Sequence, residues 1–385
     1  MKFFIKLILV SFSIILFSSC ESNDSKQDQP KEFSLELIDS VQIDYLGDMM
    51  LMDYDPTAGH YLLSRENYSK RMEVNEQGDI LNIIELSSDG INGISAALGL
   101  GYFEGKVGLL TPDEGFILFE NEERVSEITI PYPYQGFMFL PQLGLSRINN
   151  RIFYSKLWPE TFNEEVFSRD FFLKLYRFPI LESLDPVTKD TLTTMYIPEE
   201  SDILDGNING FPIPITTQFG DKMATSLWIE PKIYLYSQQG NEYVFDKMIA
   251  IEIPGWIPYV PVKPNNAEQF FEENMKFRAG TLSKILKVEE YYLAVYQKGI
   301  TADQMASIDV GSETGQLEIQ NMNPFYAAVF DQDWNQVATD LPFPKATNFP
   351  NVVNKSGEVV VSKNINLSDT EDDGMILYKL KLKVQ

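Results

Sequence analysis

The chain has 385 residues, of which 44% are hydrophobic and 23% are charged, and this composition suits a large globular body rather than a disordered chain, a collagen or a coiled coil. The 56 acidic residues outnumber the 31 basic residues and give a net charge of -25, so the long-range field repels nucleic acid and anionic lipid. One cysteine and one histidine exclude an internal disulfide, Cys/His zinc sites and most histidine-dependent catalysis.

The first segment predicts a secretory signal that ends at a lipid attachment site. Two lysines precede the apolar run Leu7–Phe17, which is too short to span a membrane. Two serines and then Cys20 follow, so the segment Leu16–Cys20 resembles the lipobox of bacterial lipoproteins. The resemblance implies that residues 1–19 are removed and that Cys20 carries acyl chains that hold the mature protein on a membrane. An ordinary signal peptide with an incidental cysteine is the alternative.

The segment behind the cysteine predicts a flexible tether. Ser22–Lys31 contains no apolar residue, a composition typical of a solvated linker. We therefore expect a lipidated residue and tether over 20–32 and one folded domain over 33–385. No later apolar stretch approaches the length of a membrane span, so we expect this domain to be soluble.

From residue 33 onward, the pattern predicts strands rather than helices. Short alternating runs rich in Tyr, Phe, Ile and Val recur between turns of Gly, Pro, Asn and Asp. Each unit contains a turn, a strand, a second turn and a partner strand. The expected pairs, in chain order, are His60–Leu63 with Arg71–Val74, Lys106–Leu110 with Phe116–Glu120, Arg151–Tyr154 with Phe171–Arg177, Lys232–Tyr236 with Tyr243–Ile253, Tyr291–Tyr296 with Phe325–Phe330, and Glu358–Val361 with Met375–Val384.

The spacing of these units predicts a β-propeller. Successive units are 46, 46, 81, 59 and 67 residues apart, measured between the strand centres Tyr61, Val107, Phe153, Tyr234, Leu293 and Val360. Four-stranded blades repeat at about 40–50 residues, so the first two spacings fit directly and the others need insertions. We expect six blades of four antiparallel strands with a large insertion near 184–225, although the longest gap leaves room for a seventh blade.

The two ends of the domain predict how the ring closes. Alternating apolar residues occupy both 35–45 and 376–384. An N-terminal strand that pairs with the last blade would leave neither sheet edge open. An irregular tandem of β-sandwiches is the alternative architecture.

The lipobox and the repeats together resemble a known group, the six-bladed β-propeller lipoproteins of TolB-like or NHL-like type from bacteria with an outer membrane. The resemblance covers nearly the whole chain. It implies an all-β propeller anchored to the outer membrane, facing the periplasm or the cell surface. It implies no site residues, because it contains no catalytic motif.

The chemical motifs leave calcium as the one cofactor to consider. His60 stands at a turn, and the chain contains no Gly-x-Ser-x-Gly elbow and no complete phosphate-binding loop. Asp205, Asn207 and Asn209 place oxygens at alternate residues of a glycine-containing loop, as at the start of a calcium-binding loop. Thr216 occupies the position where such a loop carries a bidentate glutamate, so an ordinary Asn/Asp/Gly turn is the alternative. We expect no other cofactor.

Aromatic residues on a stiff loop are the candidates for ligand binding. Trp256 and Tyr259 lie among three prolines in Pro254–Pro261. Rigid rings on loops can stack on sugars or anchor a protein partner at low entropic cost, although rings also fill the space between blades. We expect a non-catalytic, membrane-anchored module that presents one rim of the propeller to a glycan, a peptide or an envelope protein. The alternative is a propeller-type hydrolase or lactonase that uses carboxylates and a divalent metal ion.

Overall fold

The computed structural model describes residues 31–385 except for 66–67, 69, 86–92, 95–96, 112–113, 131–144, 156–164, 166 and 369–372. The chain divides into two units. One comprises the terminal segments 1–32 and 384–385, and the other comprises Phe33–Lys383. The second unit contains the sheets and is the one described below. The predicted signal segment and Cys20 lie outside the described residues.

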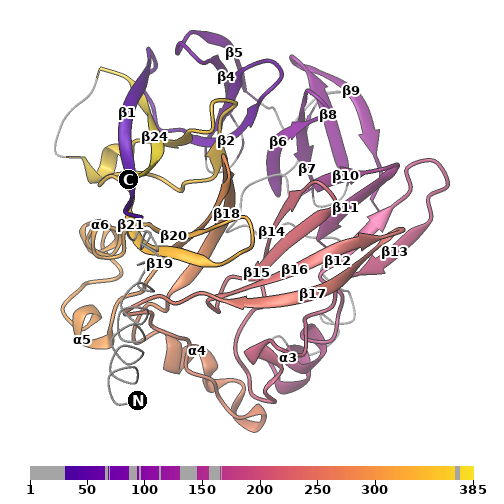
Figure 1. Cartoon of the computed structure of the whole chain (residues 1–385), viewed down its shortest axis with the longest axis vertical. Coiled ribbons are helices and arrows are strands. Elements are labelled where there is room, and N and C mark those ends of the chain that lie inside the picture. Colours follow the sequence, from indigo (N-terminus) through magenta and orange to yellow (C-terminus); the bar gives the residue numbers. More distant parts are fainter. Residues whose placement is uncertain are drawn as a thin grey trace, which may run out of the picture. The chain divides into compact units, whose positions relative to one another are not determined.

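Six four-stranded sheets form a ring, and each sheet is one blade of a propeller (Figure 1). Blades 1 and 2 contain β2 (Met50–Asp55), β3 (His60–Ser64), β4 (Lys70–Asn75) and β5 (Ile80–Glu85), then β6 (Gly99–Phe103), β7 (Lys106–Leu110), β8 (Phe116–Glu120) and β9 (Glu123–Ile128). Blades 3 and 4 contain β10 (Leu145–Ile148), β11 (Arg151–Ser155), β12 (Leu181–Leu184) and β13 (Thr191–Thr194), then β14 (Pro214–Phe219), β15 (Lys222–Leu227), β16 (Lys232–Gln239) and β17 (Glu242–Ala250). Blades 5 and 6 contain β18 (Thr281–Val288), β19 (Tyr291–Gln297), β20 (Tyr326–Phe330) and β21 (Gln336–Pro342), then β22 (Val352–Val353), β23 (Val359–Ser362), β24 (Met375–Val384) and β1 (Phe33–Ile43).

Strands from the two ends of the domain close the ring. β1 pairs with β24, so blade 6 takes one strand from the start of the domain and three from its end. Lys379 on β24 forms an ion pair with Asp39 on β1, with 3.2 Å between Nζ and Oδ2. Val41 and Ile43 are buried in one core cluster with Leu377 of β24. The predicted six-bladed, all-β propeller closed by an N-terminal strand is confirmed, and the alternatives of a seventh blade and of a sandwich tandem are wrong.

One predicted strand is wrong, because Phe171–Arg177 lies in a helix and the turn after it. The helix α3 (Arg169–Leu175) has Ser168 as its N-cap, and the Ser168 Oγ accepts a hydrogen bond from the backbone N–H of Phe171 at 3.2 Å. Phe171, Phe172 and Leu175 are buried in the same core cluster. Apolar residues spaced by one and four positions share one face of a helix but fall on both faces of a strand. The strand that pairs with β11 is β12 instead.

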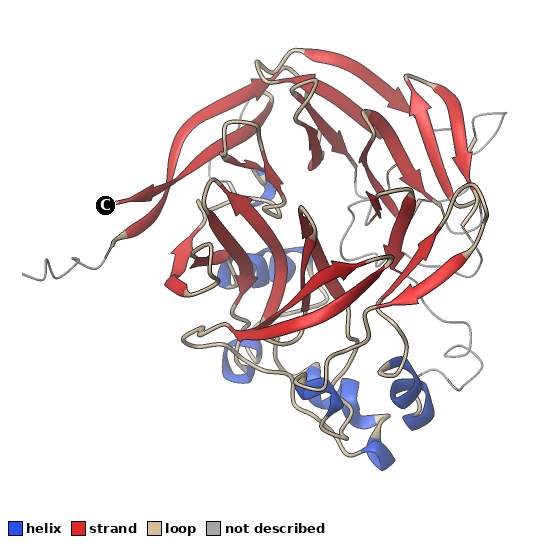
Figure 2. Cartoon of the chain, turned by 45° about the vertical axis from the view of Figure 1, so that its right-hand side comes forward, coloured by secondary structure: helices blue, strands red, loops and turns tan. Residues whose placement is uncertain are grey.

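The connections differ between the two faces of the ring. Turns of two to six residues join the first and second strands of every blade and the third and fourth strands of blades 1 to 5. In blade 6 the third and fourth strands, β24 and β1, come from the two ends of the domain. Because neighbouring strands are antiparallel, the connections from the second strand to the third and from each blade to the next emerge together on the opposite face, with lengths of up to 30 residues. We call this the long-connection face. Its connections contain α3, α4 (Gln269–Asn274), α5 (Ala302–Met305) and α6 (Glu313–Met322), which gather on one side of the sheets (Figure 2).

None of these helices, nor any other helix among the described residues, is long and apolar enough to cross a membrane.

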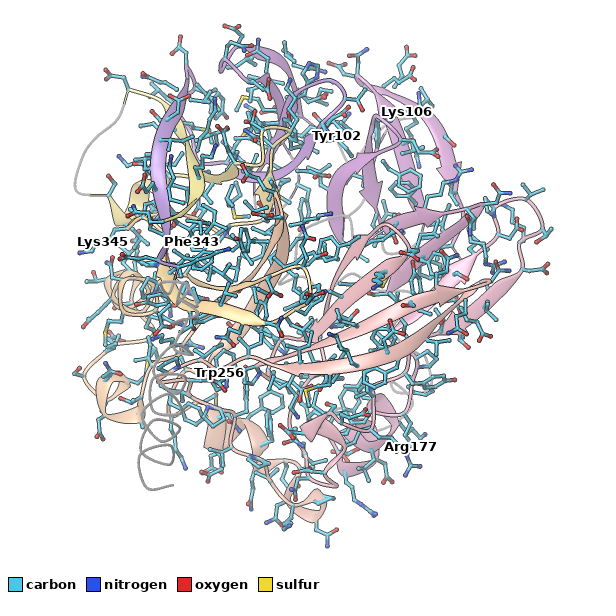
Figure 3. The ribbon with its side chains drawn as sticks, viewed as in Figure 1. Tyr102, Lys106, Arg177, Trp256, Phe343 and Lys345 are labelled. Atoms are coloured by element: carbon cyan, nitrogen blue, oxygen red, sulfur yellow. The ribbon has the colours of Figure 1, made fainter. Side chains whose placement is uncertain are left out.

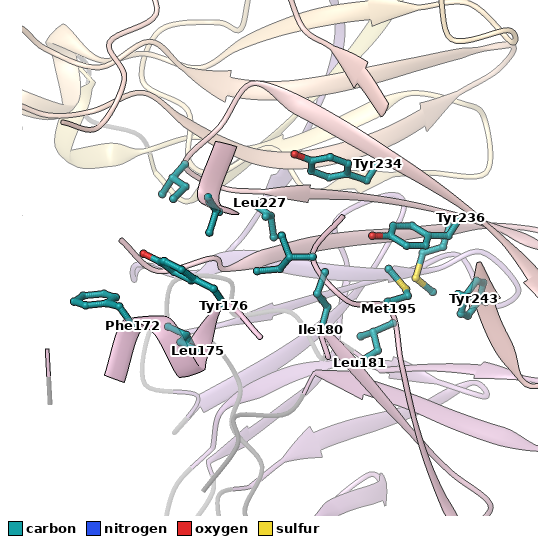
Figure 4. Packing of buried hydrophobic residues seen from close by; sticks show 14 of the residues in the cluster. Phe172, Leu175, Tyr176, Ile180, Leu181, Met195, Leu227, Tyr234, Tyr236 and Tyr243 are labelled. Carbon is teal, nitrogen blue, oxygen red and sulfur yellow. The ribbon is translucent and has the colours of Figure 1, made fainter. Parts of the chain in front are cut away.

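The apolar side chains are buried between neighbouring blades. One core cluster joins blades 3 and 4 to α3, and Figure 4 shows Leu181 of β12, Tyr236 of β16 and Phe172 of α3 within it. Many of the aromatic rings therefore fill the wedge-shaped space between blades, where a bulky and rigid side chain buries a large area.

Candidate functional site

The structure brings the two segments that contain the predicted site residues together on the long-connection face. The 205–209 segment belongs to the connection between β13 and β14, and Trp256 and Tyr259 belong to the connection between β17 and β18. Ile208 and Val262 form an isolated antiparallel bridge, with N···O distances of 2.8 and 3.1 Å in the two directions. Positions about fifty residues apart in the sequence therefore form one surface.

The Asp205 segment is organised as a turn by its own side chains. Asp205 Oδ1 accepts hydrogen bonds from the backbone N–H of Asn207 at 2.7 Å and from the side-chain amide of Asn209 at 3.0 Å, and its Oδ2 accepts one from the side-chain amide of Asn207 at 2.7 Å. Partial burial acts to raise the pKa of Asp205, but these hydrogen bonds and the nearby Lys263 hold the pKa below its usual value. Lys263 Nζ also donates to Asn207 Oδ1 at 3.2 Å.

This turn does not present converging oxygens to a cation. Both asparagines direct N–H donors at the carboxylate, and a lysine ammonium lies at the oxygen of Asn207. Within the part of the chain that the structure describes, no three His, Cys, Asp or Glu side chains gather as a metal site would require. The donor set at Asp205, Asn207 and Asn209 therefore does not fit calcium as it stands, and the predicted calcium site stays a prediction.

Trp256, labelled in Figure 3, and Tyr259 are both half-buried, and their rings pack onto the protein. Tyr259 stacks on Phe270 of α4 with ring centroids 6.0 Å apart and an interplanar angle of 15°, and burial raises the pKa of its hydroxyl. Trp256 packs against a core cluster of blades 4 and 5, and its buried Nε1 has no hydrogen-bond partner within the described part of the chain. Much of each ring face is thus covered by the protein, which leaves less of it for a ligand.

Aromatic rings join α3, α4 and the connection that follows β13 into a small lobe. Phe167, just before α3, contacts Phe271 of α4 at a centroid distance of 4.6 Å and an angle of 66°. Phe211, from the connection between β13 and β14, lies 5.7 Å from Phe172 and 6.3 Å from Phe271. Edge-to-face contacts of this kind add to the free energy gained by burying the rings. The packed rings inside the lobe therefore hold the exposed residues of α3, α4 and the neighbouring connections in fixed positions.

Three apolar side chains are exposed on the lobe near α4, among polar and charged neighbours. Phe167 is 42% exposed, Val260 is 44% exposed and Met275, directly after the helix, is 73% exposed. Asn274 holds Val260 next to the end of the helix, because its Oδ1 accepts from the Val260 N–H at 2.8 Å and its Nδ2 donates to the Val260 carbonyl at 3.0 Å. We call Phe167, Val260 and Met275 the apolar patch. Single exposed apolar residues are common on proteins, so it is the position of these three near one short helix that makes them a candidate interaction surface.

Sequence reasoning missed a second group of residues, on the first strands of the blades. Asp53 on β2 and Lys284 on β18 are partly exposed charged residues whose neighbours along the strand are buried. Burial raises the pKa of Asp53 and lowers the pKa of Lys284 to about 8, while the two opposite charges attract each other. A charged residue inside an apolar strand run is the sequence signal that could have identified them.

No protein-family model matches the chain, and no curated protein matches it. Solved structures do match. A member of the DUF4221 family from Bacteroides vulgatus is 12% identical to this chain with a TM-score of 0.61, covering 92% of this chain and 99% of that one. A candidate exported protein from Bacteroides fragilis is 12% identical with a TM-score of 0.53, covering 91% of this chain and 95% of that one. At this identity the likeness shows the fold alone, and it extends over nearly the whole chain.

Proposed function

We propose that this protein is an exported, lipid-anchored propeller of TolB-like or NHL-like type that binds a protein or peptide partner at the bacterial outer membrane through the apolar patch. The observation that carries the proposal is the exposure of Phe167, Val260 and Met275 around one helix of the long-connection face. The lipobox that ends at Cys20 and the description of the Bacteroides fragilis neighbour as an exported protein support the location.

The side chains of the patch favour a protein partner over a glycan. Sugar recognition uses the open faces of aromatic rings, whereas Tyr259 has one face stacked on Phe270 and Trp256 packs against the core. The most exposed member of the patch is Met275, whose flexible thioether adapts to the shape of an apolar partner surface. Apolar anchors surrounded by polar groups are the usual anatomy of a protein interface.

The charges beside the patch indicate what the partner carries. Glu268 and Glu272 are exposed at α4, and Glu273 forms an ion pair with Lys276 at 2.9 Å between Nζ and Oε2. The whole chain carries a net charge of -25. Complementary charge speeds association and fixes orientation, so we expect a partner surface with an apolar residue flanked by lysine or arginine. The alternative of a hydrolase or lactonase stays a prediction.

The test places a charge within the patch and measures partner recovery. Burying a methionine at an interface contributes about 1.5–3 kcal/mol, so Met275→Asp should reduce recovery of the partner from detergent-extracted envelope by at least about tenfold. Val187→Asp is the matched control, since Val187 is also exposed but lies in the turn between β12 and β13 on the opposite face. Both variants should melt at the wild-type temperature. Unchanged recovery with Met275→Asp, or an equal loss with Val187→Asp, would contradict the proposal.

A further inference from the structure

The first strands of blades 1 and 5 share an irregularity that redirects one charged side chain in each. The register between β2 and β3 shifts between Leu51 and Asp53, and the register between β18 and β19 shifts between Leu282 and Lys284. A β-bulge of this kind adds one unpaired residue and turns the side chains that follow it. In both strands the residue directly after the extra one is the charged one. Asp53 and Lys284 therefore occupy equivalent positions in two blades.

These two side chains lie inside the ring rather than on its outer edge. β2 and β18 are the first strands of their blades, and both contact the short first strand of the blade between them, β22. Asp53 and Lys284 each affect the ionisation of the other through Coulomb attraction. Both keep part of their surface accessible, although the residues on either side of them along the strands are buried. Opposite charges on the first strands of blades 1 and 5 thus act on each other, and both strands contact the strand between them.

Asn351, directly before β22, completes the group. Its Nδ2 donates hydrogen bonds of 3.0 Å to the carbonyl oxygens of Leu51 and Met52, next to the bulge in β2. These two bonds fix which end of the amide faces β2. Its Oδ1 is buried and has no hydrogen-bond partner among the residues that the structure describes, and the residue as a whole is 8% exposed. A buried acceptor without a donor lowers the free energy of unfolding by about 1–3 kcal/mol. A donor from a bound ligand would remove this cost.

The carboxylate of Asp53 is held in a fixed orientation by the backbone. Its Oδ1 accepts from the N–H of Tyr54 at 2.8 Å, and its Oδ2 accepts from the N–H of Tyr102 at 2.7 Å. Tyr102, marked in Figure 3, belongs to β6, so blades 1 and 2 together fix the position of this carboxylate. Each carboxylate oxygen has a second lone pair for a further donor. Asp53 can therefore hold its place and still accept a hydrogen bond.

We infer that Asp53, Lys284 and Asn351 form a binding site inside the ring for a small organic acid that carries a hydroxyl or amino group beside its carboxylate. The ligand carboxylate pairs with the ammonium of Lys284 in a charge-assisted hydrogen bond. An adjacent ammonium group can donate to both Asn351 Oδ1 and the carboxylate of Asp53, whereas a single hydroxyl donates to Asn351 Oδ1 alone. The ligand acceptor thereby contacts a protein donor, the ligand donor contacts protein acceptors, and Asn351 Oδ1 gains a hydrogen bond.

The ionisation of Lys284 provides a direct readout of this site. Burial lowers its pKa to about 8, against the opposing attraction of Asp53. The positive charge of Lys284 acts to lower the pKa of Asp53, whereas the negative charge of Asp55, on the same strand, acts to raise it. A bound carboxylate favours the charged ammonium, so binding must raise the pKa of Lys284. The site lies on inner strands, away from α4, so its test is independent of the proposed partner binding.

The experiment uses calorimetric titration of the full mature chain with defined probes. L-Serine and glycolate carry both required groups, acetate lacks the donor, and ethanolamine lacks the carboxylate. We expect serine or glycolate to bind at least about tenfold more tightly than acetate and ethanolamine. Lys284→Met should weaken that binding by about tenfold or more, whereas Lys381→Met, at an exposed lysine of β24, should leave it unchanged.

A second measurement covers the case in which Lys284→Met fails to fold. The wild-type lysines are reductively methylated with carbon-13 formaldehyde, and the pKa of the Lys284 signal is followed with and without the probes. A rise on adding serine or glycolate, absent with ethanolamine, supports the site. No binding of either probe at about 20 mM, equal binding of acetate, or tight binding that persists in Lys284→Met would overturn the inference.

Discussion

Ile43→Ala tests whether β1 closes the ring by packing with β24. Ile43 is the last residue of β1, is fully buried and packs in the core cluster that contains Leu377 of β24. The substitution removes three carbons, which is about 2.4 kcal/mol of lost burial at about 0.8 kcal/mol per methylene group. The cavity left behind adds to this loss, so we expect the free energy of unfolding to fall by about 3–4 kcal/mol.

Guanidinium unfolding followed by tryptophan fluorescence measures this change. Leu37→Ala is the matched control, because Leu37 lies on the same strand but is 51% exposed. Its cost should stay within about 0.5–1 kcal/mol, since little apolar surface returns to water. If Ile43→Ala were no more costly than Leu37→Ala, β1 would not be part of the packed ring, and the account of its closure would be refuted.

Three further predictions concern buried charge and the anchor. Because the folded pKa of Lys284 is about 8, below its usual 10.5, the folded chain binds fewer protons than the unfolded chain between those pH values, and its stability should rise with pH there by about 2 kcal/mol relative to Lys284→Met. A pH-independent difference in denaturant titrations from pH 7 to 10.5 would contradict this. Arg71→Met should leave the melting temperature unchanged or raise it, because the guanidinium is buried and, of its nitrogens, Nε and Nη1 have no partner among the described residues while Nη2 donates to the Asn121 carbonyl. A loss above about 2 kcal/mol would speak against this. Cys20→Ser should abolish labelling by radioactive fatty acid and release the protein from the membrane fraction, and continued labelling would show that the lipobox interpretation is wrong.

Most of the sheet structure could be predicted from periodicity and turn residues. Runs such as Lys106–Leu110 and Met375–Val384 match strands to the residue, because alternating β-branched and aromatic side chains between Gly or Asn turns leave little choice of structure. Ring closure followed from alternation at both ends of the domain. The strand predicted over Phe171–Arg177 is wrong, because the five large apolar residues of this segment satisfy a short strand as easily as a two-turn helix. The serine cap at Ser168 was the signal that favoured the helix.

The candidate site was predicted in part. The sequence pointed to Trp256, Tyr259 and the Asp205 segment, and the structure places them on one surface, yet their rings and oxygens are largely engaged by the protein. The exposure of Met275 depends on how α4 packs, and periodicity over a six-residue helix does not determine that. The electrostatic interaction of Asp53 with Lys284 depends on which blades flank blade 6, and no local pattern encodes this arrangement.

Site-specific photocrosslinking tests the central functional claim most directly. A photoreactive amino acid replaces Met275 in one strain and Val187 in another, and living cells are irradiated before the envelope is extracted. The account predicts one discrete crosslinked protein from position 275 and none from position 187, since only the former lies in the apolar patch. No crosslink at position 275, or the same products from both positions, would contradict it.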